Sequence, residues 1–165
     1  AINRDLVAAC CYAGQLDRAI EVSKRTLEMD PAAFFAHYHM GFAYLKMSKY
    51  EEALKAFQKE KEIERGVGLA EPAIAFTYMK MGKKTKAKKV LDEVRKQSGQ
   101  GYISPFNLAC LHFVLGKNDE GFELLESAYN EQDQWLSMIK PLPFTDAVQS
   151  DPRYIHMMKK MNFED

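Results

Sequence analysis

Apolar residues follow the spacing of an α-helix along most of this chain, and the pattern repeats at a fixed interval. Met40, Gly41 and Tyr44 are one and three positions apart, which places them on one face of a helix that can be buried. The same three positions recur every 34 residues. The other members of the series are Leu6, Val7 and Cys10, then Ile74, Ala75 and Tyr78, then Leu108, Ala109 and His112. The pattern predicts four copies of one helical unit.

Each copy also contains the signals of a turn followed by a second helix. Residues that tolerate a tight reversal recur at the same interval, at Gly14, Ser48, Gly82 and Gly116. A small residue follows five positions later, where we expect two helices to cross closely: Ala19, Ala53, Ala87 and Gly121. The larger residues expected to fill the adjoining space are Phe57, Leu91 and Leu125. Each copy is therefore predicted to be a helix-turn-helix unit.

These columns resemble the tetratricopeptide repeat family, whose helix-turn-helix unit also spans 34 residues. The resemblance implies an all-α, right-handed superhelix of four repeats at about residues 1–31, 32–65, 66–99 and 102–134, all in one domain. A connector is expected at residues 65–68. The chain departs from the family pattern in lacking its usual tryptophan, and at Glu60, where a small apolar residue is usual.

The C-terminal part of the chain does not keep the interval. Pro141 and Pro143 cannot continue a helix, whereas Asp151 and Pro152 read as the N-cap and first-turn proline of a short helix. Because the end of a helical array leaves an apolar face uncovered, residues 135–165 are predicted to form a cap that includes a capping helix. The region also resembles terminal tetratricopeptide and cap segments of bacterial or archaeal multidomain signalling proteins. That resemblance implies that the chain is part of a longer protein.

Composition and charge exclude several classes of function. The 23 basic and 23 acidic residues cancel, so no overall field attracts nucleic acid or acidic membranes. No apolar stretch approaches the roughly 20 residues of a membrane span, and no signal peptide opens the chain. The three cysteines, two of them adjacent, form no disulfide framework. We expect a cytoplasmic protein.

The sequence contains no recognisable catalytic, cofactor or metal site, and we do not expect an enzyme. His37 and His39 lie two positions apart on one helix and diverge in direction, so they are not expected to bind a metal. His112 falls in the column of Tyr44 and Tyr78 and is expected in the core.

One local charge feature offers an alternative function. A basic patch comprises Lys80, Lys83, Lys84, Lys86, Lys88 and Lys89. Such a patch can bind an acidic partner or the phosphates of nucleic acid. Asp92 and Glu93 partly balance it, and no aromatic residues alternate with the lysines as they do on a nucleic-acid platform. We therefore favour a solvated outer helix and do not expect nucleic acid as the partner.

The predicted helix at residues 34–45 is apolar nearly all round, so it must be covered on two sides. The stripe through Met40 accounts for one side only. By resemblance to the family, the second stripe and its counterparts line the concave surface of the superhelix, where family members hold peptides. The candidate groove comprises Phe35, Tyr38, His39, Phe42, Leu45, Leu69, Phe76, Met79, Phe106, Asn107, Cys110 and Phe113.

The predicted partner is a protein or peptide that is apolar at the site of contact. Family members that hold a C-terminal carboxylate present Lys, Arg and Asn from the concave surface. Here only Arg4, Lys46, Lys80 and Asn107 lie near it, so we expect an apolar segment or an amphipathic helix. Three alternatives remain for this face: cover by the chain's own C-terminal segment, cover by preceding repeats, or a homodimer through a second copy.

Overall fold

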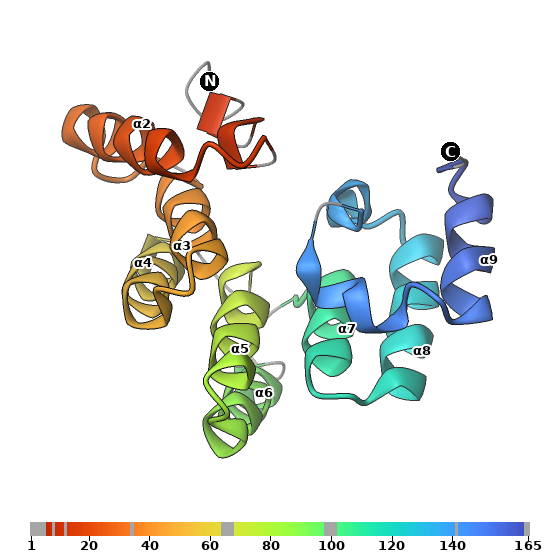
Figure 1. The fold of residues 1–165 in the computed structure, drawn as a ribbon. Helices are drawn as coiled ribbons and strands as arrows, with labels where there is room; N and C mark the ends of the chain where they lie inside the picture. Colours follow the sequence, from red (N-terminus) through yellow and green to blue (C-terminus); the bar gives the residue numbers. More distant parts are fainter. Residues whose placement is uncertain are drawn as a thin grey trace.

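A computed structural model describes residues 6–7, 9–11, 13–33, 35–63, 68–97, 102–140 and 142–163, and the secondary structure in them is entirely helical (Figure 1). Residues 6–7 and 9–11 are helical and precede the first labelled helix. The others are α2 (Leu16–Met29), α3 (Ala36–Lys46), α4 (Tyr50–Ile63), α5 (Ala70–Lys80), α6 (Lys84–Gln97), α7 (Pro105–Val114), α8 (Asn118–Asn130), the 3-10 helices η1 (Gln134–Met138) and η2 (Pro143–Val148), and α9 (Pro152–Lys160). The predicted all-α helical-repeat fold is confirmed. The expected connector at 65–68, apart from Gly68, lies outside the described residues, as do Arg4, Phe34 and Pro141.

The four predicted turns share one backbone conformation. Gly14, Ser48, Gly82 and Gly116 have φ angles of 74°, 59°, 71° and 71°. In each turn a residue just past the reversal donates its backbone N–H to the last turn of the preceding helix: Gln15 to Cys10, Lys49 to Tyr44, Lys83 to Tyr78 and Lys117 to His112, at 2.8–2.9 Å. These bonds use carbonyl groups that a helix end would otherwise leave without a donor. Glycine suits three of the turns because a positive φ costs it no steric strain.

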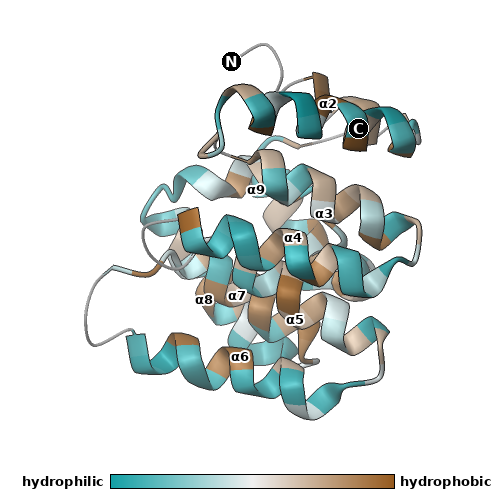
Figure 2. Ribbon diagram, turned by 90° about the vertical axis from the view of Figure 1, so that its left-hand side faces the viewer, coloured by the Kyte–Doolittle hydropathy of each residue, from teal (hydrophilic) through white to brown (hydrophobic). Residues whose placement is uncertain are grey.

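The helices of a pair pack closely because small residues stand where they cross. Ala19, Ala53 and Ala87 are completely buried. A Cβ added to Gly41 would lie 2.7 Å from the Phe57 ring, and one added to Gly121 would lie 2.5 Å from the Phe113 ring. Figure 2 shows that α4 and α6 combine hydrophilic stretches with hydrophobic bands, as expected of helices buried on one side.

Buried carboxylates hold the starts of three helices. Glu60 of α4 is fully buried, and its carboxyl group accepts hydrogen bonds from the backbone N–H groups of Phe35 (2.8 Å) and Tyr38 (3.0 Å) at the start of α3. Glu71 accepts from the Gly68 N–H (3.1 Å) at the start of α5. Asp133 accepts from the Ser104 hydroxyl (2.5 Å) and from the Phe106 N–H (3.2 Å) at the start of α7. A helix N-terminus presents N–H groups without intrahelical partners, so each acid stabilises the helix that it meets.

The C-terminal part of the chain turns back onto the repeats. Figure 1 shows α9 beside α8, and η2 packs against both α7 and α5. Ile139, Leu142, Phe144 and Val148 are each at most 2% exposed. The segment from η1 to η2 is therefore part of the hydrophobic core.

Candidate functional site

The structure buries most of the twelve residues predicted to line a binding groove. Only Phe76 and Met79 are half-buried. The ten others are less than 9% exposed: Phe35, Tyr38, His39, Phe42, Leu45, Leu69, Phe106, Asn107, Cys110 and Phe113. Most of these residues are therefore packed within the chain, and their role in binding stays a prediction.

In the second repeat, the predicted residues form an aromatic cluster. A later segment of the same chain covers this cluster. Phe35 contacts Tyr38 with ring centres 5.5 Å apart, and Tyr38 stacks on Phe42 at 6.3 Å. Trp135 of η1 meets the edge of Phe35 at 5.6 Å. Phe35 itself has a φ of 66°, a strained value for a residue with a side chain, and the Glu60 carboxyl holds its N–H.

Further along the concave side, η2 covers the third and fourth repeats. Phe144 packs against Phe76 with ring centres 5.6 Å apart. Phe113 turns its ring toward Phe122 of α8 at 5.0 Å, because Gly121 leaves room for it there. Of the alternatives that the sequence left open for this face, cover by the chain's own C-terminal segment agrees best with these contacts. The interval of 34 residues gave no sign of it, because residues 134–148 carry no helical period.

One part of the predicted surface remains open, and we call it the concave pocket. It has a volume of ≈ 470 Å³ and is lined by Phe76, Met79 and Lys80 of α5, Phe113 and Val114 of α7, and Pro143, Phe144, Asp146 and Ala147 of η2. Lys80 Nζ lies 5.1 Å from the centre of the Phe76 ring. Partial burial raises the pKa of the Asp146 carboxyl group, an effect that the positive charge of Lys80 opposes. The pocket therefore combines an apolar floor with one cation and one acid.

The other polar candidates for holding a carboxylate, Lys46 and Asn107, are engaged elsewhere. Lys46 donates to the Cys11 carbonyl oxygen (3.0 Å), and its Nζ lies 5.5 Å from the centre of the Phe42 ring. Asn107 is buried at the start of α7, where its N–H donates to the Ser104 hydroxyl (3.2 Å). These positions agree with the expectation of an apolar ligand but do not test it.

His112, Cys11 and Cys110 lie in the protein interior. His112 is buried as predicted, with Nδ1 2.8 Å from the Leu108 carbonyl oxygen, and burial lowers its pKa. Burial raises the pKa of Cys11 to about 11 and raises that of Cys110 further, so neither thiol is a ready nucleophile. Within the described ranges, no group of three or more His, Cys, Asp or Glu side chains is placed to hold a metal ion.

The lysines of the basic patch divide into two groups. Three have neighbours: Lys80 lies over Phe76, Lys83 pairs with Glu51 at 3.3 Å, and Lys86 Nζ lies 5.7 Å from the centre of the Tyr78 ring. The other three, all exposed on α6, form no ion pair with any described residue: Lys84, Lys88 and Lys89.

Comparisons with known proteins agree with this architecture. Residues 35–59 and 73–99 match the family model described as "Tetratricopeptide repeat". No curated protein matches the sequence. Among solved structures, the chain is similar to YrrB, described as a TPR protein with an unusual peptide-binding site, at 16% identity over 95% of this chain and 90% of that chain, with a TM-score of 0.52. None of the described helices has the length and apolar character that a membrane crossing requires. The chain thus carries two stretches that match tetratricopeptide repeats, within a fold similar to that of a solved tetratricopeptide-repeat protein.

Proposed function

We propose that this chain is a non-catalytic protein-interaction module that binds an apolar peptide or amphipathic helix at the concave pocket. The observation that carries the proposal is the pair of half-buried apolar side chains, Phe76 and Met79, in the one part of the predicted surface that stays open. The tetratricopeptide matches and the peptide-binding description of YrrB support the same class of function.

The size of the concave pocket sets the expected affinity. A volume of ≈ 470 Å³ suits one or two apolar side chains of a ligand. Burying each contributes about 1.5–3 kcal/mol. Association itself costs about 4–15 kcal/mol, so side chains in the pocket alone give a complex much weaker than micromolar.

The Met79→Glu substitution should abolish most of this binding. It places a charge on the apolar floor of the pocket at a half-buried position, so the helix can still fold. Peptides selected from a display library against the wild-type chain would be titrated calorimetrically into both proteins, and we expect an affinity loss of about tenfold or more. The matched control is Met29→Glu, because Met29 is 72% exposed on α2 and outside the pocket.

Equal peptide affinity in a folded Met79→Glu variant would place the ligand elsewhere. Light scattering on the same samples covers the homodimer alternative. A wild-type dimer that Met79→Glu converts to a folded monomer would identify a second copy of the chain as the occupant.

The basic patch supports a second candidate function, binding of nucleic acid or an acidic partner. The observation that favours it is the set of three exposed lysines without an ion pair among the described residues, Lys84, Lys88 and Lys89. Affinity for labelled single-stranded DNA or polyglutamate would then fall steeply as salt rises, because such binding releases counterions. Binding in the concave pocket would change little with salt.

A further inference from the structure

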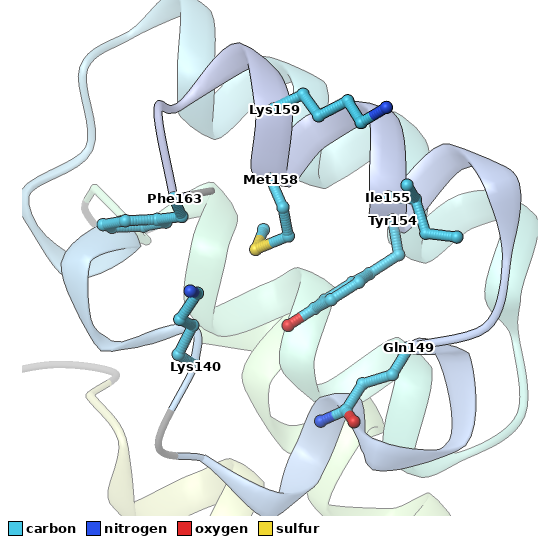
Figure 3. A pocket seen from close by; sticks show the side chains of 7 residues that line it. All are labelled: Lys140, Gln149, Tyr154, Ile155, Met158, Lys159 and Phe163. Carbon is cyan, nitrogen blue, oxygen red and sulfur yellow. The ribbon is translucent and has the colours of Figure 1, made fainter. Parts of the chain in front are cut away.

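A second pocket, with a volume of ≈ 620 Å³, lies at the C-terminal end of the fold (Figure 3). We call it the cap pocket. Its residues from α9 and beyond are Tyr154, Ile155, Met158, Lys159 and Phe163. Lys140, before η2, and Gln149, after it, complete the lining. The cap pocket shares no residue with the concave pocket.

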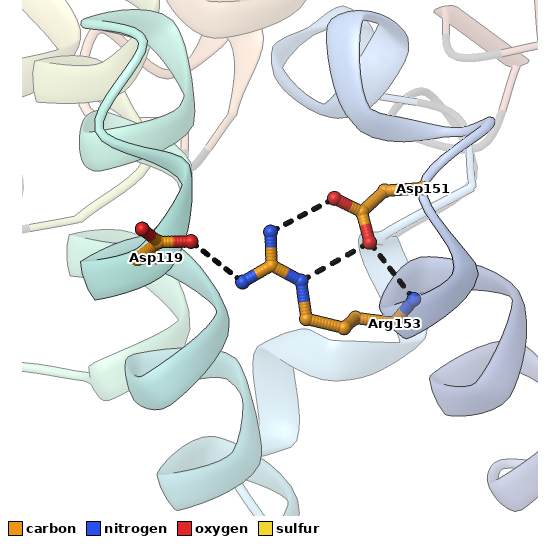
Figure 4. A network of polar contacts seen from close by, with 3 residues as sticks. All are labelled: Asp119, Asp151 and Arg153. Atoms are coloured by element: carbon orange, nitrogen blue, oxygen red, sulfur yellow. Dashed lines mark hydrogen bonds and ion pairs between the residues drawn. The ribbon is translucent and has the colours of Figure 1, made fainter.

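Polar contacts fix one side of α9 against α8. The orientation of the opposite side of the helix is therefore fixed as well. Arg153 donates to Asp151 at 2.9 Å and to Asp119 of α8 at 2.7 Å (Figure 4). Its guanidinium also lies 4.2 Å from the centre of the Phe122 ring. Two turns further on, Lys160 pairs with Glu126 of α8. These contacts hold both ends of α9 against α8.

The cap pocket has apolar side chains within it and cations around it. Ile155 is 46% exposed. Met158 is half-buried, and methionine adapts its shape to different apolar groups. Among the described residues of the lining, the charged ones are Lys140 and Lys159. Lys140 Nζ lies 5.7 Å from the centre of the Phe163 ring, and both lysines are exposed.

We propose that the cap pocket docks a segment of a partner protein in which apolar and acidic residues alternate. Its apolar side chain packs against Met158 and Ile155, and its carboxylate lies near Lys159. Charge complementarity selects this partner, because the described charged residues of the lining, Lys140 and Lys159, are cations that favour acidic segments over basic ones. The site is separate from the concave pocket, so it adds a second contact surface to the proposed interaction module.

The test uses the whole chain labelled with carbon-13 at the methionine methyl groups, whose NMR signals are assigned by Met158→Leu, Met79→Leu and Met29→Leu. The probes are a capped peptide in which Glu alternates with Leu and Phe, the same peptide with Lys for Glu, and octanoate. We expect the acidic peptide to shift the Met158 signal saturably, and less so at high salt, while the Met29 signal stays in place. The Met79 signal reports binding at the concave pocket separately, so the experiment can exclude binding at either pocket without excluding it at the other.

The Lys159→Glu substitution should lower the affinity for the acidic peptide about fivefold, which is the size of effect expected for an exposed charge pair. Lys55→Glu, at an exposed position on α4, changes the net charge equally and should leave the affinity unchanged. Equal responses of Met158 to the acidic and basic peptides would overturn the proposal, as would equal affinities of the two charge variants. A Met158 shift with octanoate and with neither peptide would also overturn it, since the site would then hold a small carboxylate.

Discussion

The Phe144→Ala substitution is expected to lower the free energy of unfolding by roughly 3–5 kcal/mol, the range for truncating a buried aromatic side chain. Phe144 is 1% exposed in η2 and packs against Phe76 across the concave side. Its removal leaves a cavity beside α5 and α7, in a core where Ile139 and Leu142 of the same segment are also at most 2% exposed.

Urea denaturation of the variant measures this loss by two probes. Helical circular dichroism reports the repeats, and fluorescence of Trp135, the one tryptophan of the chain, reports the segment that carries η1. The two transitions should coincide in the wild type, because the segment is part of the core and unfolds with the helices. The matched control on the same 3-10 helix is Ala147→Ser, an exposed position, with an expected change within about 0.5 kcal/mol.

A different result would change the view of the concave surface. If Trp135 fluorescence changed at much lower urea than the circular dichroism, and Phe144→Ala cost little, the segment would be a detachable cover. The whole predicted groove would then become open to a partner, including the cluster around Phe35 and Phe42. If the two transitions coincide, as expected, the concave pocket is the part of the predicted groove that is open to a partner.

The repeat architecture was predictable from the sequence because its signals are local and recur. The turn conformation at Gly14, Ser48, Gly82 and Gly116 depends on a few neighbouring residues, and the backbone confirms it at all four. The predicted N-cap at Asp151 is also confirmed, since its carboxylate accepts from the Arg153 N–H at 2.9 Å. Such features need no knowledge of distant contacts.

The extent of the open surface was not predictable, because it depends on contacts between segments far apart in the chain. Trp135 meets Phe35 across 100 positions, and Phe144 meets Phe76 across 68. Residues 134–138 and 143–148 form two 3-10 helices, and their short length leaves no period to detect. The direction of Phe113 likewise depends on the space above Gly121 in the neighbouring helix.

Glu60 illustrates the same limit at a single residue. In the sequence it is a departure from the family pattern, an acid where a small apolar residue is usual. In the structure it is fully buried and meets the start of α3, 25 positions earlier in the chain. Burial raises the pKa of its carboxyl group, and hydrogen bonds from the backbone N–H groups of Phe35, Tyr38 and His37 act in the opposite direction. Glu60 therefore caps the start of α3 from a position that is distant in the sequence.

The Glu60→Ala substitution should consequently lower the free energy of unfolding by roughly 2–4 kcal/mol, which is more than the loss on removing an exposed helix cap. It leaves the N–H groups of Phe35 and Tyr38 buried without their acceptor, and it releases Phe35 from the contact that holds its positive φ. Urea denaturation followed by circular dichroism measures the loss.

The matched control is Glu62→Ala, two positions along the same helix. Glu62 is exposed and pairs with Lys59 at 2.6 Å on the surface, so its removal should cost at most about 0.5 kcal/mol. Equal losses for the two variants would mean that Glu60 acts only through the general charge of α4. A large loss confined to Glu60→Ala, with a changed Trp135 emission, would instead connect this cap to the aromatic cluster, because Trp135 lies against the residue that Glu60 holds.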